Sequence, residues 1–290
     1  MKVGIFIHPN INSPRDIIDS IIGFILDHDN DVTVPDTTNR GVFANITDII
    51  FCSVDEISNK VDVVFSIGGD GTFLKASRVM AGTGKPVIGI HLGGLGFLAD
   101  ISPHNYRDRV TAFFNKEYTV KQRGIIGAKV KFKDHADSYF ALNDFVIDKG
   151  HIVKMIKIKI FVDNEYLNTY RSDGLIISTP TGSTAYSLSA GGPIVFPELN
   201  VISICPICPH TLSARPVVIS GNQTVSIDCS EFNSDVSLDV DGQNRIPLAD
   251  AQFVEIHRAD FTLPIIKFDG DSFFQTLRTK MNWGRDIRGN

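Results

Sequence analysis

The segment Gly68-Gly69-Asp70-Gly71-Thr72 has the residue types that phosphate chemistry needs, and it lies between an apolar stretch and a predicted helix. Glycines let a phosphate approach the backbone, and the N-terminus of the following helix offers unpaired N–H groups and the positive end of the helix dipole. A carboxylate repels phosphate unless it handles a metal ion or accepts a proton from an attacking hydroxyl. Asp70 therefore indicates phosphoryl transfer; the alternative is a sharp turn in which Asp70 only caps the helix.

A pair of polar residues, Asn143-Asp144, interrupts the apolar stretch 139–145. Asparagine offers both a donor and an acceptor to a purine edge, and a carboxylate accepts hydrogen bonds from ribose hydroxyls. The pair therefore predicts a nucleoside contact. The alternative is a β-bulge or the end of a strand.

Residues 179–186 (TPTGSTAY) join a predicted strand to a predicted helix and are rich in hydroxyl side chains. Hydroxyls at a helix N-terminus suit a phosphate or a sugar, and Tyr186 can stack on a base. The alternative is a capped helix start with a buried tyrosine. Further along, His210 is a lone histidine, for which a structural role is the more common one.

Other phosphate-binding patterns are absent from the sequence. It contains no G-x-x-x-x-G-K-[ST] loop, no G-x-G-x-x-G motif and no protein-kinase motifs. Lys75 and Arg78 follow the GGDG segment, and a solvated helix face explains both of them.

The first third of the chain alternates predicted strands with predicted helices. Residues 3–7, 61–67 and 87–90 are short apolar runs, as in buried parallel strands. Isoleucines at helical spacing over 17–25 predict an amphipathic helix, preceded by Ser13-Pro14 as N-cap and first helical residue. Strand, glycine turn and helix in this order predict a parallel α/β sheet.

From about residue 119 onward the predicted elements are mostly strands. Asp163-Asn164 and Asp241-Gly242 suit tight hairpin turns. One helix over 183–190 interrupts the strands, and a helix over 272–280 is expected to return to the first domain. The predicted domains are an α/β domain over 1–118 and 268–290 and a mostly-β domain over 119–267. The strands are predicted over 120–132, 139–147, 154–162, 165–171, 175–178, 217–219, 224–229, 236–240 and 253–258.

Composition places the chain among globular proteins. It has 290 residues, of which 43% are hydrophobic and 21% charged, and its formal net charge is −5. A mildly acidic chain has no general attraction for nucleic acid or anionic membranes. No apolar run reaches the length of a membrane span, and the N-terminal apolar run is too short for a signal peptide, so we expect a cytoplasmic protein.

The four cysteines are too few for a disulfide scaffold. Cys205 and Cys208 form a C-x-x-C pair, but a structural zinc site needs a second pair of ligands, and His210 is the only obvious neighbour. We expect packed, reduced thiols, with a zinc module as a distant alternative.

Taken in order, these motifs resemble the NAD kinase family in its bacterial form. The resemblance runs from about residue 61 to 242. The GGDGT element is also found in lipid kinases and phosphofructokinases, whereas the stretch from 179 is highly specific. The segments that carry the resemblance are 68–74 (GGDGTFL), 93–98 (GGLGFL), 143–144 (ND), 173–174 (DG), 179–193 (TPTGSTAYSLSAGGP) and 209–216 (PHTLSARP).

The resemblance implies a Rossmann-like N-terminal domain, a β-rich C-terminal domain, and a final helix that returns to the first. It also implies an enzyme that transfers the γ-phosphoryl of ATP to the 2′-hydroxyl of the adenosine ribose of NAD. The product is NADP, and the reaction uses a divalent metal, Mg²⁺ or Mn²⁺. Polyphosphate is an alternative donor in this family, whose members are homodimers or homotetramers.

By motif position, the resemblance makes Asp70 the proton acceptor that faces the 2′-hydroxyl, and it makes Asn143 and Asp144 the contacts to adenine and ribose. Because family members have sites near subunit contacts, the resemblance also implies that His210 serves a neighbouring subunit. No residue is assigned as a metal ligand. The other residues that it places at the nucleotides are Gly68, Gly69, Gly71, Thr72, Phe97, Arg171, Asp173, Thr181, Thr184, Ala185, Tyr186, Ser189, His210 and Gln243.

Asp144 departs from the family pattern, which more often has Glu after the Asn. Its carboxylate is one methylene shorter, so either the backbone compensates or a water bridges to the ribose. Two other functions stay open from the sequence: a related GGDGT lipid kinase, and a non-catalytic sensor that binds NAD or NADP.

Overall fold

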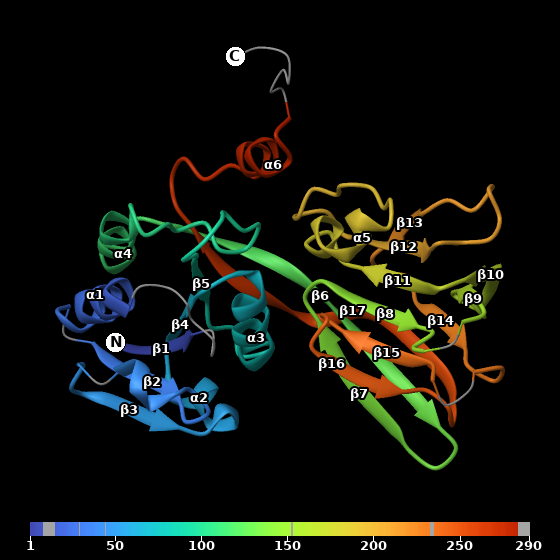
Figure 1. The fold of residues 1–290 in the computed structure, drawn as a ribbon, viewed down its shortest axis with the longest axis horizontal. Helices are drawn as coiled ribbons and strands as arrows, with labels where there is room; N and C mark the ends of the chain where they lie inside the picture. Colours follow the sequence, from blue (N-terminus) through green and yellow to red (C-terminus); the bar gives the residue numbers. More distant parts are fainter. Residues whose placement is uncertain (8–14, 29, 44, 152, 233–234, 284–290) are drawn as a thin grey trace. The chain divides into compact units, whose positions relative to one another are not determined.

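A computed structural model of the chain describes residues 1–7, 15–28, 30–43, 45–151, 153–232 and 235–283. The chain divides into two compact units, one built from Met1–Gln122 together with the residues from Leu263 onward, the other from Arg123–Thr262. The long strands β6 (Thr119–Phe132) and β17 (Ala251–Lys267) carry the chain from one unit to the other (Figure 1).

The N-terminal unit contains a parallel sheet in the order β5-β4-β1-β2-β3. The last part of β17 adds to its edge, parallel to β5, through Ile265 and Val87. This order and pairing are those of a Rossmann-like sheet. The strands are β1 (Lys2–Ile7), β2 (Asp31–Pro35), β3 (Ile49–Cys52), β4 (Val63–Ile67) and β5 (Val87–Ile90).

Helices cover both faces of this sheet (Figure 1). The pair α1 (Arg15–Leu26) and α4 (Tyr106–Phe114) pack together, and so do α2 (Val54–Lys60) and α3 (Asp70–Met80). The predicted isoleucine stripe of α1 is confirmed, since its buried residues are Ile18, Ile21, Ile22 and Ile25. The predicted cap at Ser13-Pro14 lies outside the described residues, and a short 3-10 turn, η1 (Arg40–Phe43), joins β2 to β3.

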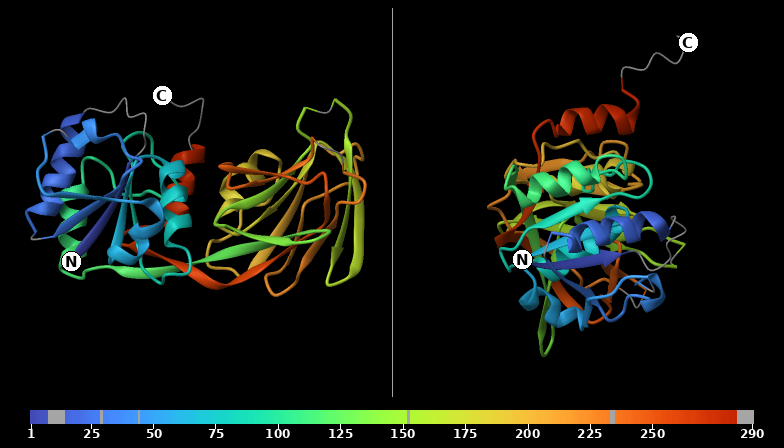
Figure 2. Two further views of the ribbon diagram at one scale, coloured as in Figure 1. Left: turned by 90° about the horizontal axis from the view of Figure 1, so that it is seen from below. Right: turned by 90° about the vertical axis from the view of Figure 1, so that its left-hand side faces the viewer.

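The C-terminal unit contains two antiparallel layers, which face one another in the left view of Figure 2. One apolar core fills the space between them, with Phe145 and Ile177 from one layer and Ile160, Ile227 and Ile256 from the other. The six-stranded layer has the order β13 (Val217–Ser220), β12 (Val201–Ile207), β11 (Gly174–Ser178), β8 (Asp144–Asp148), β15 (Ser237–Val240) and β16 (Asn244–Pro247). The other layer contains β10 (Glu165–Ser172), β9 (Ile156–Val162), β14 (Val225–Asp228), the first part of β17, β6 and β7 (Ala136–Ala141).

The predicted fold class, an α/β domain and a mostly-β domain, is confirmed, but two predicted elements are wrong. The predicted strand over 139–147 breaks after β7, and β8 continues in the other layer. The predicted helix over 183–190 is divided into a 3-10 turn, η2 (Gly182–Thr184), and one short turn, α5 (Tyr186–Ser189). The backbone of Ala185, with φ −99° and ψ −132°, makes the division because it is not helical.

Both predicted hairpin turns are confirmed by left-handed backbone angles. Asp163 and Asn164 have φ values of 50° and 69°, and Asp241 and Gly242 have φ values of 52° and 63°. Two consecutive residues with positive φ are typical of the tight turn that joins antiparallel strands. Asp and Asn tolerate this region because their short polar side chains bond locally.

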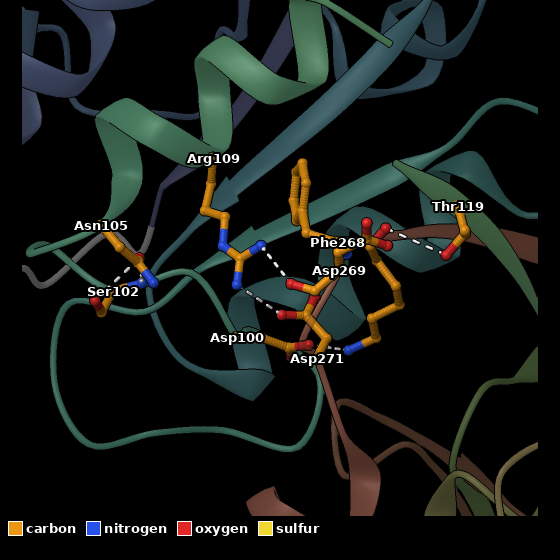
Figure 3. Close-up of polar contacts among 9 residues, drawn as sticks. Asp100, Ser102, Asn105, Arg109, Thr119, Phe268, Asp269 and Asp271 are labelled. Carbon is orange, nitrogen blue, oxygen red and sulfur yellow. Dashed lines mark hydrogen bonds and ion pairs between the residues drawn. The ribbon is translucent and has the colours of Figure 1, made fainter. Parts of the chain in front are cut away.

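The C-terminal helix α6 (Phe273–Met281) belongs to the N-terminal unit, and a set of polar contacts fixes the segment before it (Figure 3). Arg109 on α4 donates to the carbonyl of Asp269 at 3.2 Å and to the carboxylate of Asp271 at 3.1 Å. The other carboxylate oxygen of Asp271 accepts the N–H of Phe268 at 2.8 Å. The hydroxyl of Ser272 caps α6 by accepting the N–H of Gln275.

None of the helices within the described residues is both long enough and apolar enough to cross a membrane.

Candidate functional site

The glycine turn between β4 and α3 leaves its backbone open. Gly68 must be a glycine, because a Cβ there would lie 2.5 Å from the hydroxyl oxygen of Thr72. Gly69 and Gly71 are exposed, and a Cβ on either would meet no atom within 4 Å. Gly69, in an extended conformation, is the N-cap of α3. The start of α3 therefore presents exposed glycine backbone that a ligand can approach closely.

The carboxylate of Asp70 turns away from its own helix and toward the segment that follows β5. Its Oδ2 accepts the N–H of Phe97 and its Oδ1 accepts the N–H of Leu98, both at 3.2 Å. A Cβ on Gly96 would collide with Oδ1, so a glycine is needed there. The alternative in which Asp70 only caps α3 is wrong. Instead, two backbone donors orient a carboxylate whose side chain is still 34% exposed.

In the C-terminal unit, Asp241 organises the turn that contains Asn143 and Asp144. Its Oδ2 accepts the N–H of Leu142 at 3.0 Å, and its Oδ1 accepts the N–H groups of Asn143 and Asp144 at 2.8 and 3.1 Å. The N–H of Asp241 in turn donates to the carbonyl of Asp144 at 3.0 Å. These bonds explain why the predicted strand over 139–147 breaks here, since three consecutive N–H groups converge on one side chain.

The hydroxyl-rich segment packs directly against this turn. The hydroxyl of Thr179 donates to the carbonyl of Leu142 at 2.6 Å, and the N–H of Thr179 donates to the carbonyl of Asn143 at 2.8 Å. Thr179 also accepts the N–H of Gly182 at 3.0 Å, and a Cβ on Gly182 would collide with the backbone of Asn143. Two motifs separated by about 35 residues in the sequence, 143–144 and 179–186, thus form one structure.

Carboxylates gather on one face of the six-stranded layer. The strand register places Asp144 and Asp148 of β8 on the same face as Asp239 of β15. Asp144 is only 4% exposed, and burial raises its pKa from 3.8 to about 7, with the negative charges of Asp241 and Asp239 adding to the effect. Burial likewise raises the pKa of Asp239, and Arg245 opposes that shift. Asp144 therefore keeps its proton to a higher pH than an ordinary aspartate.

Tyr186 stands beside these carboxylates and is 46% exposed, so the alternative of a buried tyrosine is wrong. Partial burial raises the pKa of its hydroxyl, and the charges of Asp148, Cys208, Asp144 and Asp173 raise it further. The exposed part of Tyr186 therefore lies near polar groups that suit a nucleoside. The carboxylate of Asp173 accepts a hydrogen bond from the ammonium of Lys149 at 2.6 Å.

The other expected contact residues of this unit take several positions. The hydroxyl of Thr181 is buried without a hydrogen-bond partner among the described residues, and its carbonyl accepts the hydroxyl of Thr184 at 3.2 Å. Arg171 and His210 are both exposed, and the N–H of His210 donates to the carbonyl of Arg171 at 2.9 Å. Ala185 is half-buried and Ser189 exposed, and the exposed Gln243 lies two residues after Asp241 on the β15–β16 hairpin.

All four cysteines are free. Cys205 is buried on β12, whereas Cys208 is exposed just after that strand. Within the described parts of the chain, no group of three or more His, Cys, Asp or Glu side chains could hold a metal ion.

Comparison with known proteins decides the family. Residues 3–118 match the family model of the ATP-NAD kinase N-terminal domain, and residues 142–268 match that of the ATP-NAD kinase C-terminal domain. The NAD kinase of Bacteroides fragilis is 42% identical over 234 residues, which cover 81% of this chain and 80% of that protein. The NAD kinase of Clostridium botulinum is 36% identical over 289 residues, which cover 99% of each chain.

The chain belongs to the ATP-NAD kinase family.

Solved structures agree with this assignment. The crystal structure of yeast NADH kinase complexed with NADH has a TM-score of 0.89 and 25% identity, covering 100% of this chain and 90% of that one. The NAD kinase from Archaeoglobus fulgidus in complex with ATP has a TM-score of 0.78 and 23% identity, covering 97% and 99% of the two chains, and shows the shared fold. The resemblance stated from the motifs is confirmed, together with the expectation of an NAD kinase, and the lipid-kinase alternative is set aside.

Local sequence patterns do not reveal the roles of three residues of this ATP-NAD kinase family member. The pattern Asp241-Gly242 predicts only a turn, Gly96 belongs to a glycine-rich motif, and no motif includes Lys280. Lys280 places its ammonium nitrogen 3.9 Å from Oδ2 of Asp70. For Asp241 the sequence does offer a signal, the hairpin pattern Asp241-Gly242. The aspartate of such a turn can point into the protein instead of into solvent.

The raised pKa of Asp144 predicts a pH-dependent stability. The native state binds this proton more tightly than the unfolded chain, so wild-type stability falls as the pH rises from about 4 to 7. Asp144→Asn stays uncharged. Its stability relative to wild type should therefore increase between pH 5 and pH 8, on the order of 2 kcal/mol. Urea unfolding at both pH values measures this, with exposed Asp250→Asn as the control for net charge. An equal difference at both pH values would contradict the prediction.

The three N–H groups that converge on Asp241 predict a large effect of its removal. Asp241→Ala leaves them without their acceptor and puts alanine at a φ of 52°, so we expect a loss of about 2–4 kcal/mol in unfolding free energy. Asp241→Asn keeps an acceptor oxygen and tolerates this φ, so its loss should be about half as large. Denaturant unfolding compares the two variants. Equal stability of Asp241→Ala and wild type would show that the turn forms without this side chain.

Proposed function

We propose that Asp70 is the group that accepts the proton of the 2′-hydroxyl when this chain transfers the γ-phosphoryl of ATP to the adenosine ribose of NAD. The observation that carries the assignment is the carboxylate itself, held by the N–H groups of Phe97 and Leu98 beside a glycine turn with open backbone. The relatives whose structures contain NADH and ATP support the two substrates.

The proposed reaction starts with attack by the 2′-oxygen of the ribose. The 2′-oxygen gives its proton to the carboxylate of Asp70 and forms a bond to the γ-phosphorus. The bond from that phosphorus to the bridging oxygen breaks in line, and ADP leaves. The two N–H bonds fix the carboxylate before substrate arrives, so the protein supplies position and electrostatics more than covalent chemistry.

The C-terminal unit is proposed to hold the nucleoside of NAD. Asn143 offers an amide to the adenine edge, and Asp144 offers a carboxyl group to the ribose. Near neutral pH that carboxyl, with a pKa of about 7, can accept or donate a hydrogen bond. Tyr186 presents its exposed ring for stacking. The other proposed contacts of this unit are Arg171, Asp173, Thr181, Thr184, Ala185, Ser189, His210 and Gln243.

In the N-terminal unit, Gly68, Gly69, Gly71 and Thr72 are proposed to follow the phosphates, and Phe97 to line the site. The exposure of Gly69 and Gly71, at which a Cβ would meet no atom within 4 Å, supports this role.

A divalent metal fits this site as a companion of the substrate phosphates. Mg²⁺ is commonly held by one or two carboxylates together with phosphate oxygens. The described residues contain no three-ligand cluster, and Asp70 is a partly exposed carboxylate at the glycine turn. Asp70 would therefore be its protein contact. A bound metal would neutralise charge on the phosphates.

Three parts of the proposal depend on the resemblance to the family. They are the use of polyphosphate as a second donor, assembly as a homodimer or homotetramer, and location in the cytoplasm. The four free thiols agree with a reducing compartment.

Asp70→Asn tests the assigned base, because it keeps the shape of the side chain and removes the proton acceptor. Formation of NADP from NAD, ATP and Mg²⁺, read with an NADP-specific dehydrogenase, should fall by roughly 10²–10⁴-fold in kcat. Binding of NAD, measured by calorimetry, should persist. A variant that binds NAD and turns it over at the wild-type rate would exclude Asp70 as the base. A wild-type protein that binds NADP tightly without turnover would instead be a sensor.

Gly96→Ala tests whether the orientation of Asp70 matters, because the new methyl group occupies the place of Oδ1. We expect kcat to fall about 10–100-fold, since a small displacement of a reacting group is costly. Gly94→Ala is the matched control, because a Cβ at that exposed position meets nothing within 4 Å. Equal kcat values in the two variants would show that the position of Asp70 is not critical.

A further inference from the structure

We propose that Lys280 of α6 is a positioning residue for phosphoryl transfer, acting through the carboxylate of Asp70. The inference depends on the proposed role of Asp70 as proton acceptor. Its starting point is a distance of 3.9 Å between the ammonium nitrogen of Lys280 and Oδ2 of Asp70. This is the same oxygen that accepts the N–H of Phe97. One oxygen of the carboxylate thus faces both a backbone donor and a cation.

Phe97 links the lysine to the segment that holds Asp70. The ammonium nitrogen of Lys280 lies 4.8 Å from the centre of the Phe97 ring, within the range of a cation–π contact. Phe273, at the other end of α6, places its ring centre 6.4 Å from that of Phe97. The side chains of Lys280 and Asp70 are 31% and 34% exposed, so the pair is partly shielded but open to a ligand.

One face of α6 makes these contacts. Phe273, Leu277 and Lys280 are spaced four and three residues apart, which places them on the same side of a helix. Leu277 is buried, with 4% of its surface exposed. The apolar residues therefore seat the helix, and the lysine at its last turn projects from the same face.

The segment before α6 is anchored to the loop that holds Asp70. Lys267 forms an ion pair with Asp100, which lies two residues after Leu98. Arg109 holds Asp269 and Asp271 directly before the helix (Figure 3). Both the start of α6 and the loop 96–100 are thus connected to the same segment. These contacts support the approach of α6, and with it of Lys280, to Asp70.

The positive charge of Lys280 would reduce the repulsion between Asp70 and the phosphates of ATP. Asp70 must stay close to the phosphates of ATP, and like charges at such distances repel. A neighbouring ammonium group offsets that repulsion and holds Oδ2 in one orientation. A partly exposed ion pair contributes little to folding, so we expect its removal to change turnover and not stability.

The primary test is Lys280→Met in the full chain. We expect kcat for NADP formation to fall about 10–100-fold, while KM for NAD and for ATP stays within about threefold. Lys280→Arg should restore most of kcat because it returns the cation. The melting temperature should not change. Arg278→Met is the matched control, since it removes an exposed cation from the same turn of α6, and it should leave kcat unchanged.

A rescue experiment separates the charge from the packing of the side chain. In Lys280→Ala, added ethylamine or propylamine should recover part of kcat, because a small ammonium ion can enter the partly exposed space. Tetramethylammonium at the same ionic strength, which cannot donate a hydrogen bond, should not. A merely structural role of Lys280 would give no difference between these cations.

Three results would overturn the proposal: a kcat of Lys280→Met within twofold of wild type, an equal loss in Arg278→Met, or a higher KM for ATP with unchanged kcat. The last would make Lys280 a phosphate-binding residue. Asp70→Asn is measured in parallel. If it is inactive while Lys280→Met is fully active, only the role of Lys280 fails; if Asp70→Asn is fully active, the proposed base itself fails.

Discussion

The hydrogen bonds from the N–H groups of Phe97 and Leu98 to the carboxylate of Asp70 are the constraint around which the N-terminal unit is arranged. They require β4 and β5 to be neighbours, because Asp70 follows one strand and the donors follow the other. They require a glycine at 96, where any side chain would displace the carboxylate. The N-cap of α3 is Gly69, which has no side chain that could cap the helix in place of Asp70. The orientation of one carboxylate thus depends on two neighbouring strands and on a glycine at 96.

In the C-terminal unit a carboxylate also accepts consecutive backbone N–H groups, but there it shapes a turn between strands. Asp241 accepts three consecutive N–H groups and so turns the chain from one layer of the unit into the other. The turn then offers its carbonyl groups to Thr179, which fixes the start of the hydroxyl-rich segment. In both units a carboxylate replaces the regular backbone partner that a strand or helix would provide. Each of these partly exposed carboxylates is stabilised because it accepts at least two N–H bonds.

Local patterns in the sequence were sufficient to predict those structural features that depend on residues close together in the chain. The isoleucine stripe of α1, the two hairpin turns and the motifs at 68–72 and 179–186 were recognisable because each depends on neighbours within a few residues. The break after β7 and the division of the predicted helix 183–190 could not be recognised from the sequence. Both follow from contacts with residues far along the chain. Asp241 lies almost 100 residues from the turn that it organises, and Gly96 lies more than 20 residues from Asp70. The periodicity of apolar residues along the sequence does not reveal pairs of residues that lie so far apart in the chain.

The two units, each taken by itself, offer surfaces of different charge. The glycine turn has exposed glycine backbone and one carboxylate, with a cation beside it, which suits phosphates. The face with Asp144, Asp148 and Asp239 is acidic and would repel phosphates, whereas ribose hydroxyls and the amino group of adenine are donors that carboxylates accept. The raised pKa of Asp144 lowers that repulsion further, since a protonated carboxyl bears no charge. Asp144 is only 4% exposed on β8, and burial is the main cause of the shift. The charge of this carboxyl is therefore controlled by its burial in the sheet more than by its charged neighbours.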